Sequence, residues 1–328
     1  MEKIASLKKL EVELQNSNHI FIVTGANGWI GKATVMLLAQ YLGKSAPNRI
    51  IPCSSSLSHF NLQNGTKLKC RKLEELGSLP KSLPYIIFHF AFLTKDKLLQ
   101  MPVSEFAVAN LEIRKKITDF IKETKPEGII YASSGAVYNN DRTISNDITV
   151  NPYGFLKAQD ESHFLTVSAD IGTKLVIPRI FNIAGYYINK WEIYALSSFI
   201  MQALNHKHIL INAKHPVIRS YVNVIDVINL CLLYLLDKQQ SSKENIFDTV
   251  GTEELELTAL AELVRSCLGE ENIPIIREGY DAELLPDRYV GCDHAQNILL
   301  NKFQYQPFSI QTSINQTIKY IKNVEVGI

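Results

Sequence analysis

The sequence predicts an α/β protein in which helices cover both faces of a parallel sheet. From residue 19 onward, strand-like runs alternate with helix-like segments, and the runs are apolar throughout, as expected for strands that are buried on both sides. With right-handed crossovers this alternation gives a doubly wound sheet. The strand-like runs span 19–24, 49–53, 85–91, 128–133 and 174–180, and the helix-like segments span 29–42, 103–122 and 152–169.

Shorter elements flank this core. Residues 1–17 carry aliphatic side chains at helical spacing, which predicts an amphipathic helix packed against the body of the chain or against a partner chain. After residue 182 we expect a smaller, mixed lobe, in which Thr258 opens a helix that ends before Gly269. The other elements of this half are expected at 193–204, 208–212, 226–237, 245–250, 274–277 and along the isoleucine face of Ile310, Ile314, Ile318 and Ile321.

Composition narrows the class of protein. The 328 residues are 46% hydrophobic and 20% charged, with a formal net charge of +1, so a nucleic-acid-binding surface is not expected. Five cysteines without a C-x-x-C pair indicate neither a disulfide framework nor a zinc site, and no metal is expected. The charged N-terminus is unlike a signal peptide, and polar residues interrupt the longest apolar stretch, 224–236. We therefore expect a cytoplasmic protein with reduced thiols and no membrane segment.

A glycine-rich turn joins the first strand to the first long helix. Its three glycines let the backbone turn tightly and approach a ligand, while the N–H groups and dipole of the following helix attract a pyrophosphate. In this strand–turn–helix context the turn is typical of dinucleotide binding, which makes the predicted fold Rossmann-type. The residues expected at the cofactor are Gly25, Asn27, Gly28, Trp29, Ile30 and Gly31.

The end of the second strand bears on the choice of cofactor. An NAD enzyme usually places Asp or Glu there to bind the ribose 2′-hydroxyl, but this chain has Cys53-Ser54-Ser55-Ser56. Hydroxyl groups without a carboxylate could accommodate a 2′-phosphate, although no arginine follows at once. The sequence thus favours NADP over NAD, with Ser54 and Ser55 at the ribose. A shift of about two to four residues in the strand boundary is the competing explanation.

Three residues form the candidate catalytic centre. Tyr153 and Lys157 are four residues apart at the start of a helix, so their side chains share one face. A nearby ammonium and an oxidised nicotinamide would both stabilise a phenolate and lower the pKa of Tyr153 from about 10 toward the working range. Ser134 follows a buried strand at the edge where parallel sheets bind ligands, and its hydroxyl could hydrogen-bond a substrate carbonyl.

Asn110 interrupts the apolar stripe of the helix expected at 103–122. A buried amide needs polar partners, which could be a proton-relay water or backbone carbonyl groups. We expect Asn110 to serve the relay, and a purely structural role is the alternative.

Together these motifs resemble the extended short-chain dehydrogenase/reductase family, whose members mostly act on nucleotide-activated sugars. The resemblance covers about residues 19–323. Its marks are the glycine-rich turn, His89-Phe90-Ala91, Asn110, Ser133-Ser134, Tyr153-x-x-x-Lys157, Pro178-Arg179-Ile180-Phe181-Asn182, the run from Arg219 to Asp226, and Asp287-Arg288-Tyr289.

The resemblance assigns roles to individual residues. It implies a catalytic triad of Ser134, Tyr153 and Lys157, with Lys157 also holding the nicotinamide ribose. Ala91 and Ile180 would line the cofactor site. The arginines would lie near the diphosphate or ribose, for which their planar charged fork is suited, and a surface ion pair is the alternative for either. The residues implied for the sugar nucleotide are Asn182, Arg219 and Arg288.

Departures from the family pattern reduce the number of reactions that are expected. The 4,6-dehydratases of the family carry an acidic pair where this chain has Gly135 and Ala136, which cannot supply the acid and base that elimination of water needs. The sequence therefore predicts an NADP- or NAD-dependent reductase of a 4-keto-deoxysugar nucleotide. The close alternative is a 4-epimerase that keeps NAD bound. Further alternatives are a reductase of a non-nucleotide ketone and a non-catalytic dinucleotide-binding protein.

These expectations imply a domain organisation. A helical leader is expected at 1–18, a Rossmann domain at 19–182 to which 217–250 return, and a substrate-binding lobe at 183–216 and 251–328. The expected partner is a nucleoside-diphosphate sugar, and the expected assembly is a homodimer.

Overall fold

The computed structural model describes residues 5–56, 58–205, 208–239 and 245–325. Its seven-stranded sheet confirms the predicted doubly wound architecture, with parallel strands in the order β12-β8-β6-β5-β1-β2 and β7 beside β8. The strands of this sheet are β1 (Ile20–Thr24), β2 (Ile50–Cys53), β5 (Tyr85–His89), β6 (Gly128–Tyr131), β7 (Ser133–Ser134), β8 (Lys174–Ile180) and β12 (Ile246–Asp248).

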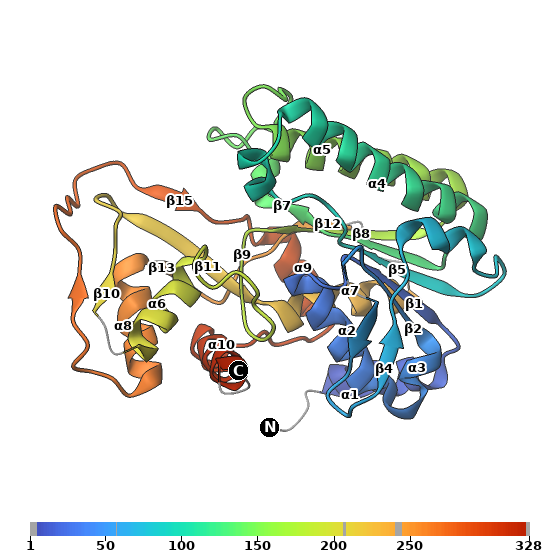
Figure 1. Cartoon of the computed structure of the whole chain (residues 1–328), viewed down its shortest axis with the longest axis horizontal. Helices are drawn as coiled ribbons and strands as arrows, with labels where there is room; N and C mark the ends of the chain where they lie inside the picture. The colour runs from blue at the N-terminus through green and yellow to red at the C-terminus, as the bar shows by residue number, and fades with distance from the viewer. Residues whose placement is uncertain (1–4, 57, 206–207, 240–244, 326–328) are drawn as a thin grey trace.

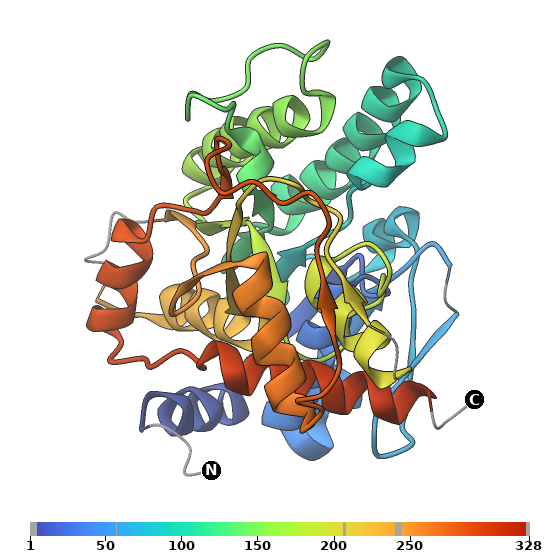
Figure 2. The ribbon, with the colours of Figure 1, turned by 90° about the vertical axis from the view of Figure 1, so that its left-hand side faces the viewer.

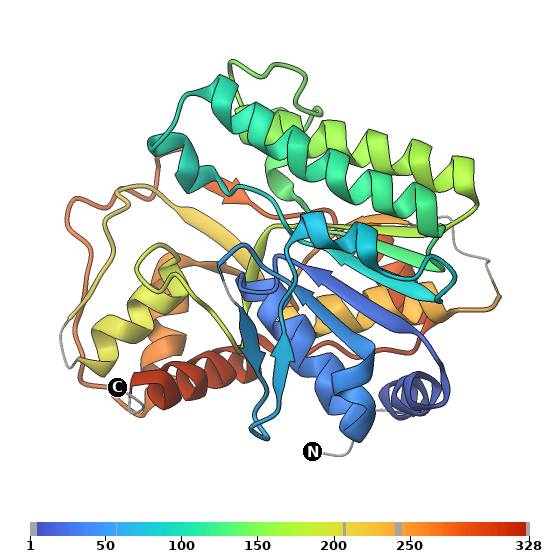
Figure 3. The same ribbon diagram turned by 45° about the vertical axis from the view of Figure 1, so that its right-hand side comes forward.

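The strands send alternate side chains to opposite faces of this sheet, and helices cover both faces. Ile22, Ile87 and Ile129 belong to a core shared with α4 and α5, whereas Phe21 and Phe88 belong to a core shared with α1, α2 and α7. Figure 3 shows α4 and α5 side by side across one face. This double coverage explains why the strands are apolar throughout. The helices are α1 (Ala5–Asn16), α2 (Trp29–Leu42), α4 (Val103–Thr124), α5 (Pro152–Ile171) and α7 (Val224–Leu236).

The N-terminal helix α1 belongs to the core of the large lobe. Leu10 and Leu14 are buried among residues of α2 and α7. The guanidinium of Arg49 completes this contact by donating to the carbonyl oxygen of Leu14 at 2.9 Å and to the hydroxyl of Ser17 at 2.7 Å. Of the two partners expected for this helix, the structure shows the body of the chain.

A second sheet forms the smaller lobe, which lies beside the large lobe in Figure 1. Its strands have the order β13-β11-β15, with β9 paired to β11, and a two-stranded sheet joins β10 to β14. As predicted, α10 buries its isoleucine face, and it packs against α8 (Figure 2). The elements are β9 (Asn182–Ala184), α6 (Ala195–Leu204), β10 (Ile209–Leu210), β11 (Val217–Asn223), β13 (Glu254–Glu256), α8 (Leu257–Leu268), β14 (Ile275–Ile276), β15 (Asp287–Tyr289) and α10 (Ile310–Glu325).

Some boundaries differ from the prediction for physical reasons. Because β11 joins the smaller sheet, the chain returns to the large lobe at Val224 and not at residue 217. Helix α8 begins at Leu257 because Glu256, and not Thr258, caps it: the Glu256 carboxylate accepts the N–H of Thr258 at 2.7 Å. Several elements were not predicted because they are too short to show a periodic pattern, among them α3 (Ala46–Arg49), β3 (His59–Asn61), β4 (Lys67–Lys69) and α9 (His294–Lys302). The longer strand β11 was not predicted either.

Within the described residues, the helices are all too short or too polar to cross a membrane.

Candidate active site

The buried hydroxyl of Thr24 links the carboxyl ends of β1 and β5 through hydrogen bonds. Its oxygen accepts the backbone N–H groups of Phe90 at 3.0 Å and Ala91 at 3.1 Å, and lies 2.8 Å from Nδ1 of His89. Burial lowers the pKa of His89 to about 3, so the ring is neutral and Nδ1 accepts the Thr24 proton. These bonds hold the glycine-rich turn close to the backbone that follows β5. A Cβ on Gly25, whose φ is +66°, would lie 2.8 Å from the carbonyl carbon of Phe90.

The glycine-rich turn leaves the N-terminus of α2 open to a ligand. A Cβ at Gly31 would lie 2.2 Å from the carbonyl oxygen of Gly25, whereas a Cβ at Gly28 would meet only that oxygen, at 3.2 Å. The N–H groups of Trp29 and Ile30 open the helix without intrahelical acceptors, and Gly28 supplies no side-chain cap. This cradle fits the pyrophosphate of a dinucleotide.

Neighbouring segments hold the side chains around this cradle. Asn27 links the turn to the end of β2 by donating to the hydroxyl of Ser56 at 3.1 Å. The indole N–H of Trp29 donates to the carbonyl oxygen of Tyr186 in the smaller lobe at 2.7 Å. Ile30 and Ile180 line one small apolar cavity, so the end of β8 packs against the start of α2.

The end of β2 carries the predicted serines and is paired with a segment that contains an arginine. Ser54 is buried and Ser55 is exposed. Arg71 lies beside them, because the chain after β4 runs alongside β2: the N–H of Ser54 donates to the carbonyl oxygen of Arg71, and the N–H of Arg71 donates to that of Pro52, both at 3.0 Å. Arg71 therefore lies beside the end of β2, although it is distant from these serines in the sequence.

Lys157 is buried in α5 and directs its ammonium toward the end of β6. Nζ donates to the carbonyl oxygen of Ala132 at 2.8 Å and lies 4.0 Å and 4.8 Å from the ring centres of Phe92 and Tyr131. Burial lowers the pKa of Lys157 to about 8, an effect that the charge of Asp160 opposes.

Tyr153 and Ser134 meet at the carboxyl edge of the large sheet. The hydroxyl of Ser134 accepts the N–H of Ala136 at 3.1 Å, and the phenol of Tyr153 lies near it. Burial raises the pKa of Tyr153, and the nearby Ser134 hydroxyl opposes this rise. In the protein alone the Lys157 ammonium donates to the carbonyl oxygen of Ala132; the lowering of the Tyr153 pKa by this ammonium together with an oxidised nicotinamide stays a prediction.

The structure gives Asn110 structural partners. Its Oδ1 accepts the N–H of Leu93 at 2.7 Å, and its Nδ2 donates to the carbonyl oxygen of Phe106 at 3.0 Å. These bonds fix the segment after β5, whose Phe92 ring lies over the ammonium of Lys157. The geometry supports the structural alternative more than a proton relay.

The smaller lobe brings Asn182 and Arg219 to the same edge of the large sheet. Nδ2 of Asn182 donates to the carbonyl oxygen of Tyr289 at 3.3 Å. The guanidinium of Arg219 lies 5.8 Å from the centre of the Tyr289 ring and donates to the carboxylate of Asp287 at 2.7 Å. Tyr289, the last residue of the Asp287-Arg288-Tyr289 motif, packs its ring on that of Phe181 with the centroids 4.7 Å apart. The smaller lobe therefore meets the large lobe where β8 ends.

Arg288 lies outside this meeting point. In the parallel pair of β11 and β15, Ile218 is opposite Arg288 and Arg219 is opposite Tyr289, so the two arginines point to opposite faces of the smaller sheet. Arg288 instead forms an exposed ion pair with Glu254 on β13. The structure thus does not bring Arg288 and Arg219 together, and for Arg288 it shows the surface ion pair that the sequence analysis gave as the alternative.

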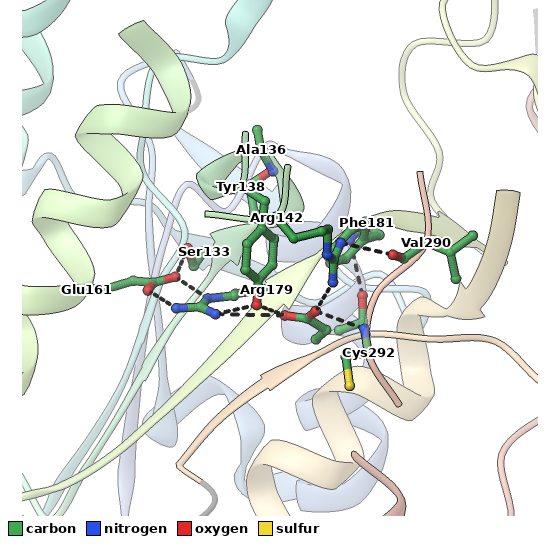
Figure 4. A network of polar contacts seen from close by, with 12 residues as sticks. Ser133, Ala136, Tyr138, Arg142, Glu161, Arg179, Phe181, Val290 and Cys292 are labelled. Carbon is green, nitrogen blue, oxygen red and sulfur yellow. Dashed lines mark hydrogen bonds and ion pairs between the residues drawn. The ribbon is translucent and has the colours of Figure 1, made fainter. Parts of the chain in front are cut away.

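A network of polar contacts joins the elements that carry the site (Figure 4). Ser133 donates to Glu161 at 2.5 Å, and Arg179 binds the same carboxylate through two N–H groups, at 2.9 Å and 2.6 Å. Arg179 also donates to the hydroxyl of Tyr138 at 2.5 Å, which in turn donates to Asp248 at 3.0 Å. Two buried carboxylates are thus satisfied, and β7, α5, β8 and β12 are held in one arrangement.

The cradle yields a first prediction. Gly28→Val should abolish dinucleotide binding while the fold survives, because a branched side chain there fills the space for the pyrophosphate. Gly77→Val is the matched control, since no heavy atom lies within 4 Å of a Cβ at Gly77. Calorimetric titration with NAD and NADP, with circular dichroism to verify folding, makes the comparison. Unchanged affinity in folded Gly28→Val would show that the turn binds no pyrophosphate.

The buried ammonium yields a second prediction. Lys157 has a pKa of about 8 when folded and its ordinary value of 10.5 when unfolded, so the unfolded chain holds more protons between these pH values and this residue makes stability rise with pH there. Lys157→Met lacks that rise. Its free energy of unfolding relative to the parent should therefore fall as the pH increases from about 8 to about 10.5. Urea unfolding across this range measures the difference, and a constant difference would contradict the depressed pKa.

Comparison with known proteins identifies the family. Residues 21–248 match the NAD dependent epimerase/dehydratase family. The UDP-glucose 4-epimerase of Mycoplasma genitalium is 26% identical over 206 residues, which are 55% of this chain and 61% of that relative, so the match spans less than two thirds of its length.

Two solved structures illustrate the similarity of fold. The UDP-glucose 4-epimerase of Thermotoga maritima, solved with UDP-glucose, gives a TM-score of 0.70 at 18% identity over 94% of this chain and 99% of that chain. The UDP-glucuronic acid 4-epimerase of Bacillus cereus, in complex with UDP-glucuronic acid and NAD, gives 0.71 at 17% identity over 93% and 99%. The protein is thus a member of the NAD dependent epimerase/dehydratase family, the extended short-chain dehydrogenase/reductases that its sequence motifs resemble.

Proposed function

We propose that the protein is a nucleotide-sugar 4-epimerase that keeps a nicotinamide dinucleotide bound. One observation carries the proposal: the glycine cradle and the residues Ser134, Tyr153 and Lys157 lie at the same carboxyl edge of the large sheet, while Arg219 of the smaller lobe lies beside Tyr289, whose ring packs on Phe181 at the end of β8. A dinucleotide in the cradle and a diphosphate at Arg219 would bring a nicotinamide and a sugar ring together at Ser134.

Each residue of the centre has a defined task in this reaction. Ser134 would hydrogen-bond the oxygen on C4 of the sugar and hold it against Tyr153. Tyr153 would take the proton of the C4 hydroxyl as the C4 hydrogen departs with its electron pair, and would return the proton when the hydride comes back to the opposite face. The nicotinamide, when bound, accepts and returns that hydride. Lys157 would hold the nicotinamide ribose and favour the phenolate of Tyr153.

The choice among reactions rests on the relatives and on two small residues. The relatives compared above are 4-epimerases of UDP-sugars, which favours a UDP-sugar and NAD here. Dehydration is disfavoured because Gly135 and Ala136 carry no acid or base, and a Cβ on Gly135 would lie 2.6 Å from the ring of Phe181.

A second candidate is the 4-keto-sugar nucleotide reductase that the sequence favoured, with NADPH as the hydride donor. Its support is local to the end of β2: serines stand where a carboxylate would bind a ribose hydroxyl, and Arg71 lies beside Ser54. The contact between Arg71 and Ser54 is through the backbone, and the guanidinium of Arg71 donates to the hydroxyl of Ser78 at 3.5 Å; turned toward the serines, it would suit a 2′-phosphate. Epimerisation and reduction share Ser134, Tyr153 and Lys157 and differ in whether the hydride returns.

A ketone reductase for a non-nucleotide substrate and a non-catalytic dinucleotide-binding protein are weaker alternatives. Arg219 argues against the first, because a neutral substrate offers no diphosphate for its guanidinium. The intact Ser134, Tyr153 and Lys157 argue against the second.

The proposal extends to the assembly and the compartment. Val108 and Leu111 expose apolar surface along α4, where a second copy could pack to form a homodimer. The proposal also places the protein in the cytoplasm, where its five cysteines would stay reduced.

The direct test begins with the purified protein and UDP-glucose, without added cofactor. Formation of the C4 epimer, with NAD released on denaturation, supports the 4-epimerase. Consumption of one equivalent of added NADPH per 4-keto sugar, without epimer formation, would replace it by the reductase. Turnover of neither would contradict both.

The two arginines provide a matched pair for the substrate class. Arg219→Ala should raise KM for the nucleotide sugar roughly 10–100-fold, because a charge-assisted contact to the diphosphate is lost. Arg288→Ala should change KM about twofold or less, since it breaks only an exposed ion pair with Glu254. Steady-state kinetics compares them. Equal effects, or a larger effect of Arg288→Ala, would show that the diphosphate binds elsewhere.

A further inference from the structure

The guanidinium of Arg142 joins the large lobe to the smaller lobe. One of its N–H groups donates to the carbonyl oxygen of Val290 at 3.1 Å, and another donates to the carboxylate of Asp248 at 3.2 Å (Figure 4). Arg142 belongs to the loop between β7 and α5 and Asp248 ends β12, so both lie in the large lobe, whereas Val290 directly follows β15. The guanidinium therefore binds the two lobes at once.

Asp248 holds the same segment through a second contact. Its buried carboxylate also accepts the backbone N–H of Cys292 at 2.9 Å. Between the two bonded residues, Gly291 packs closely on Asp248: a Cβ at Gly291 would lie 2.6 Å from the Cβ of Asp248 and 3.1 Å from the ring of Phe181. The chain at 290–292 is thus docked on the large lobe by two hydrogen bonds and by close packing.

The backbone of Arg142 is strained. Its φ is +68°, in the left-handed region that residues other than glycine rarely adopt. The turn is closed by hydrogen bonds from the N–H of Arg142 to the carbonyl oxygen of Asn139 at 2.9 Å and from the N–H of Asn139 to that of Thr143 at 2.8 Å. The guanidinium also lies 4.2 Å from the ring centre of Tyr138. An arginine held in this conformation indicates a functional constraint on its side chain.

The docked segment continues β15, the strand that holds Arg219. The guanidinium of Arg219 donates to the carbonyl oxygen of Asp287 at 2.8 Å and to its carboxylate at 2.7 Å. Strand β15 lies at the end of its sheet and is paired with β11 over three residue pairs, so contacts beyond the sheet contribute to its position. Because Asp287 is three residues from Val290 on one extended chain, a shift of the docked segment would also move the guanidinium of Arg219.

We propose that Arg142 is a positioning residue, which fixes β15 on the large lobe and thereby holds the guanidinium of Arg219 where the diphosphate of the substrate binds. The inference rests on the proposed role of Arg219 toward a nucleotide sugar. Arg142 acts through β15 and contacts neither the substrate nor the dinucleotide. Its loss should therefore weaken substrate binding and spare dinucleotide binding, because the glycine cradle is formed by β1, β5 and α2.

The test measures binding of UDP, a nucleoside diphosphate without the sugar, by isothermal titration calorimetry. Arg142→Gln removes the charged fork from a half-exposed side chain and should weaken the affinity for UDP about tenfold, because Arg219 is no longer held toward the diphosphate. The affinity for NAD should change by about twofold or less, which also verifies folding. In an Arg219→Ala background, Arg142→Gln should have no further effect on UDP binding, since the residue that it positions is absent.

Hydrogen–deuterium exchange measures whether the segment is released. In Arg142→Gln, the backbone amides of 287–292 should exchange about tenfold faster or more, because the contact to Val290 is lost. Arg265→Gln is the matched control. Arg265 likewise donates to a backbone carbonyl oxygen, that of Ile273, at 3.1 Å and lies 3.9 Å from the carboxylate of Glu271, but these contacts stay within the smaller lobe. The control should change neither the exchange of 287–292 nor the affinity for UDP.

The outcomes separate this inference from the proposed function. Where Arg219→Ala weakens UDP binding, unchanged UDP affinity in Arg142→Gln would overturn the inference, even if 287–292 exchange faster. A loss in the Arg219→Ala background equal to that in the parent would also overturn it, because Arg142 would then act without Arg219. A parent that binds no UDP, or binds it equally well as Arg219→Ala, would reject the proposed diphosphate site and the inference with it.

Discussion

The close approach of the turn at Gly25 to the backbone after β5 is the constraint on which the rest of the site depends. Thr24 creates it by bonding both N–H groups that follow His89, and only a glycine with positive φ fits the space that remains. The start of α2 is thereby aimed at the edge of the sheet where Ser134 ends β7. A parallel sheet brings all its carboxyl ends to one edge, and here that edge holds both the phosphate cradle and the candidate catalytic residues.

This arrangement requires that charged side chains be buried. The ammonium of Lys157 is held by one carbonyl oxygen and two aromatic rings, and its depressed pKa reflects that burial. One turn later on α5, Glu161 is paired with Arg179, and that pairing continues to Asp248 and the smaller lobe. Such a network gains little stability over an apolar core, but it fixes the relative position of its members. It thus links the helix that carries Tyr153 to the segment that carries Tyr289.

Much of this could be predicted from sequence because the signals are local. The helix Trp29–Leu42 was predicted at its observed bounds, and the glycine spacing and the Tyr153–Lys157 pair each lie within one turn or one helix. What could not be predicted depends on pairing between distant segments. A backbone bridge places Arg71 beside the end of β2, and the register of β11 with β15 turns Arg288 away from Arg219. Tyr289 belongs to a motif of the resemblance, but its packing on Phe181 depends on how the two lobes meet.

The central claim is that Tyr153 moves the proton that accompanies hydride transfer at Ser134. The most direct measurement is single-turnover kinetics of Tyr153→Phe with the nucleotide sugar that the parent converts, because the substitution removes the phenol proton and keeps the ring. The account predicts that substrate and dinucleotide still bind, while the rate of the chemical step falls by about 10²–10⁴-fold. A variant that retains most of the parent's rate would contradict the mechanism, whatever the fold.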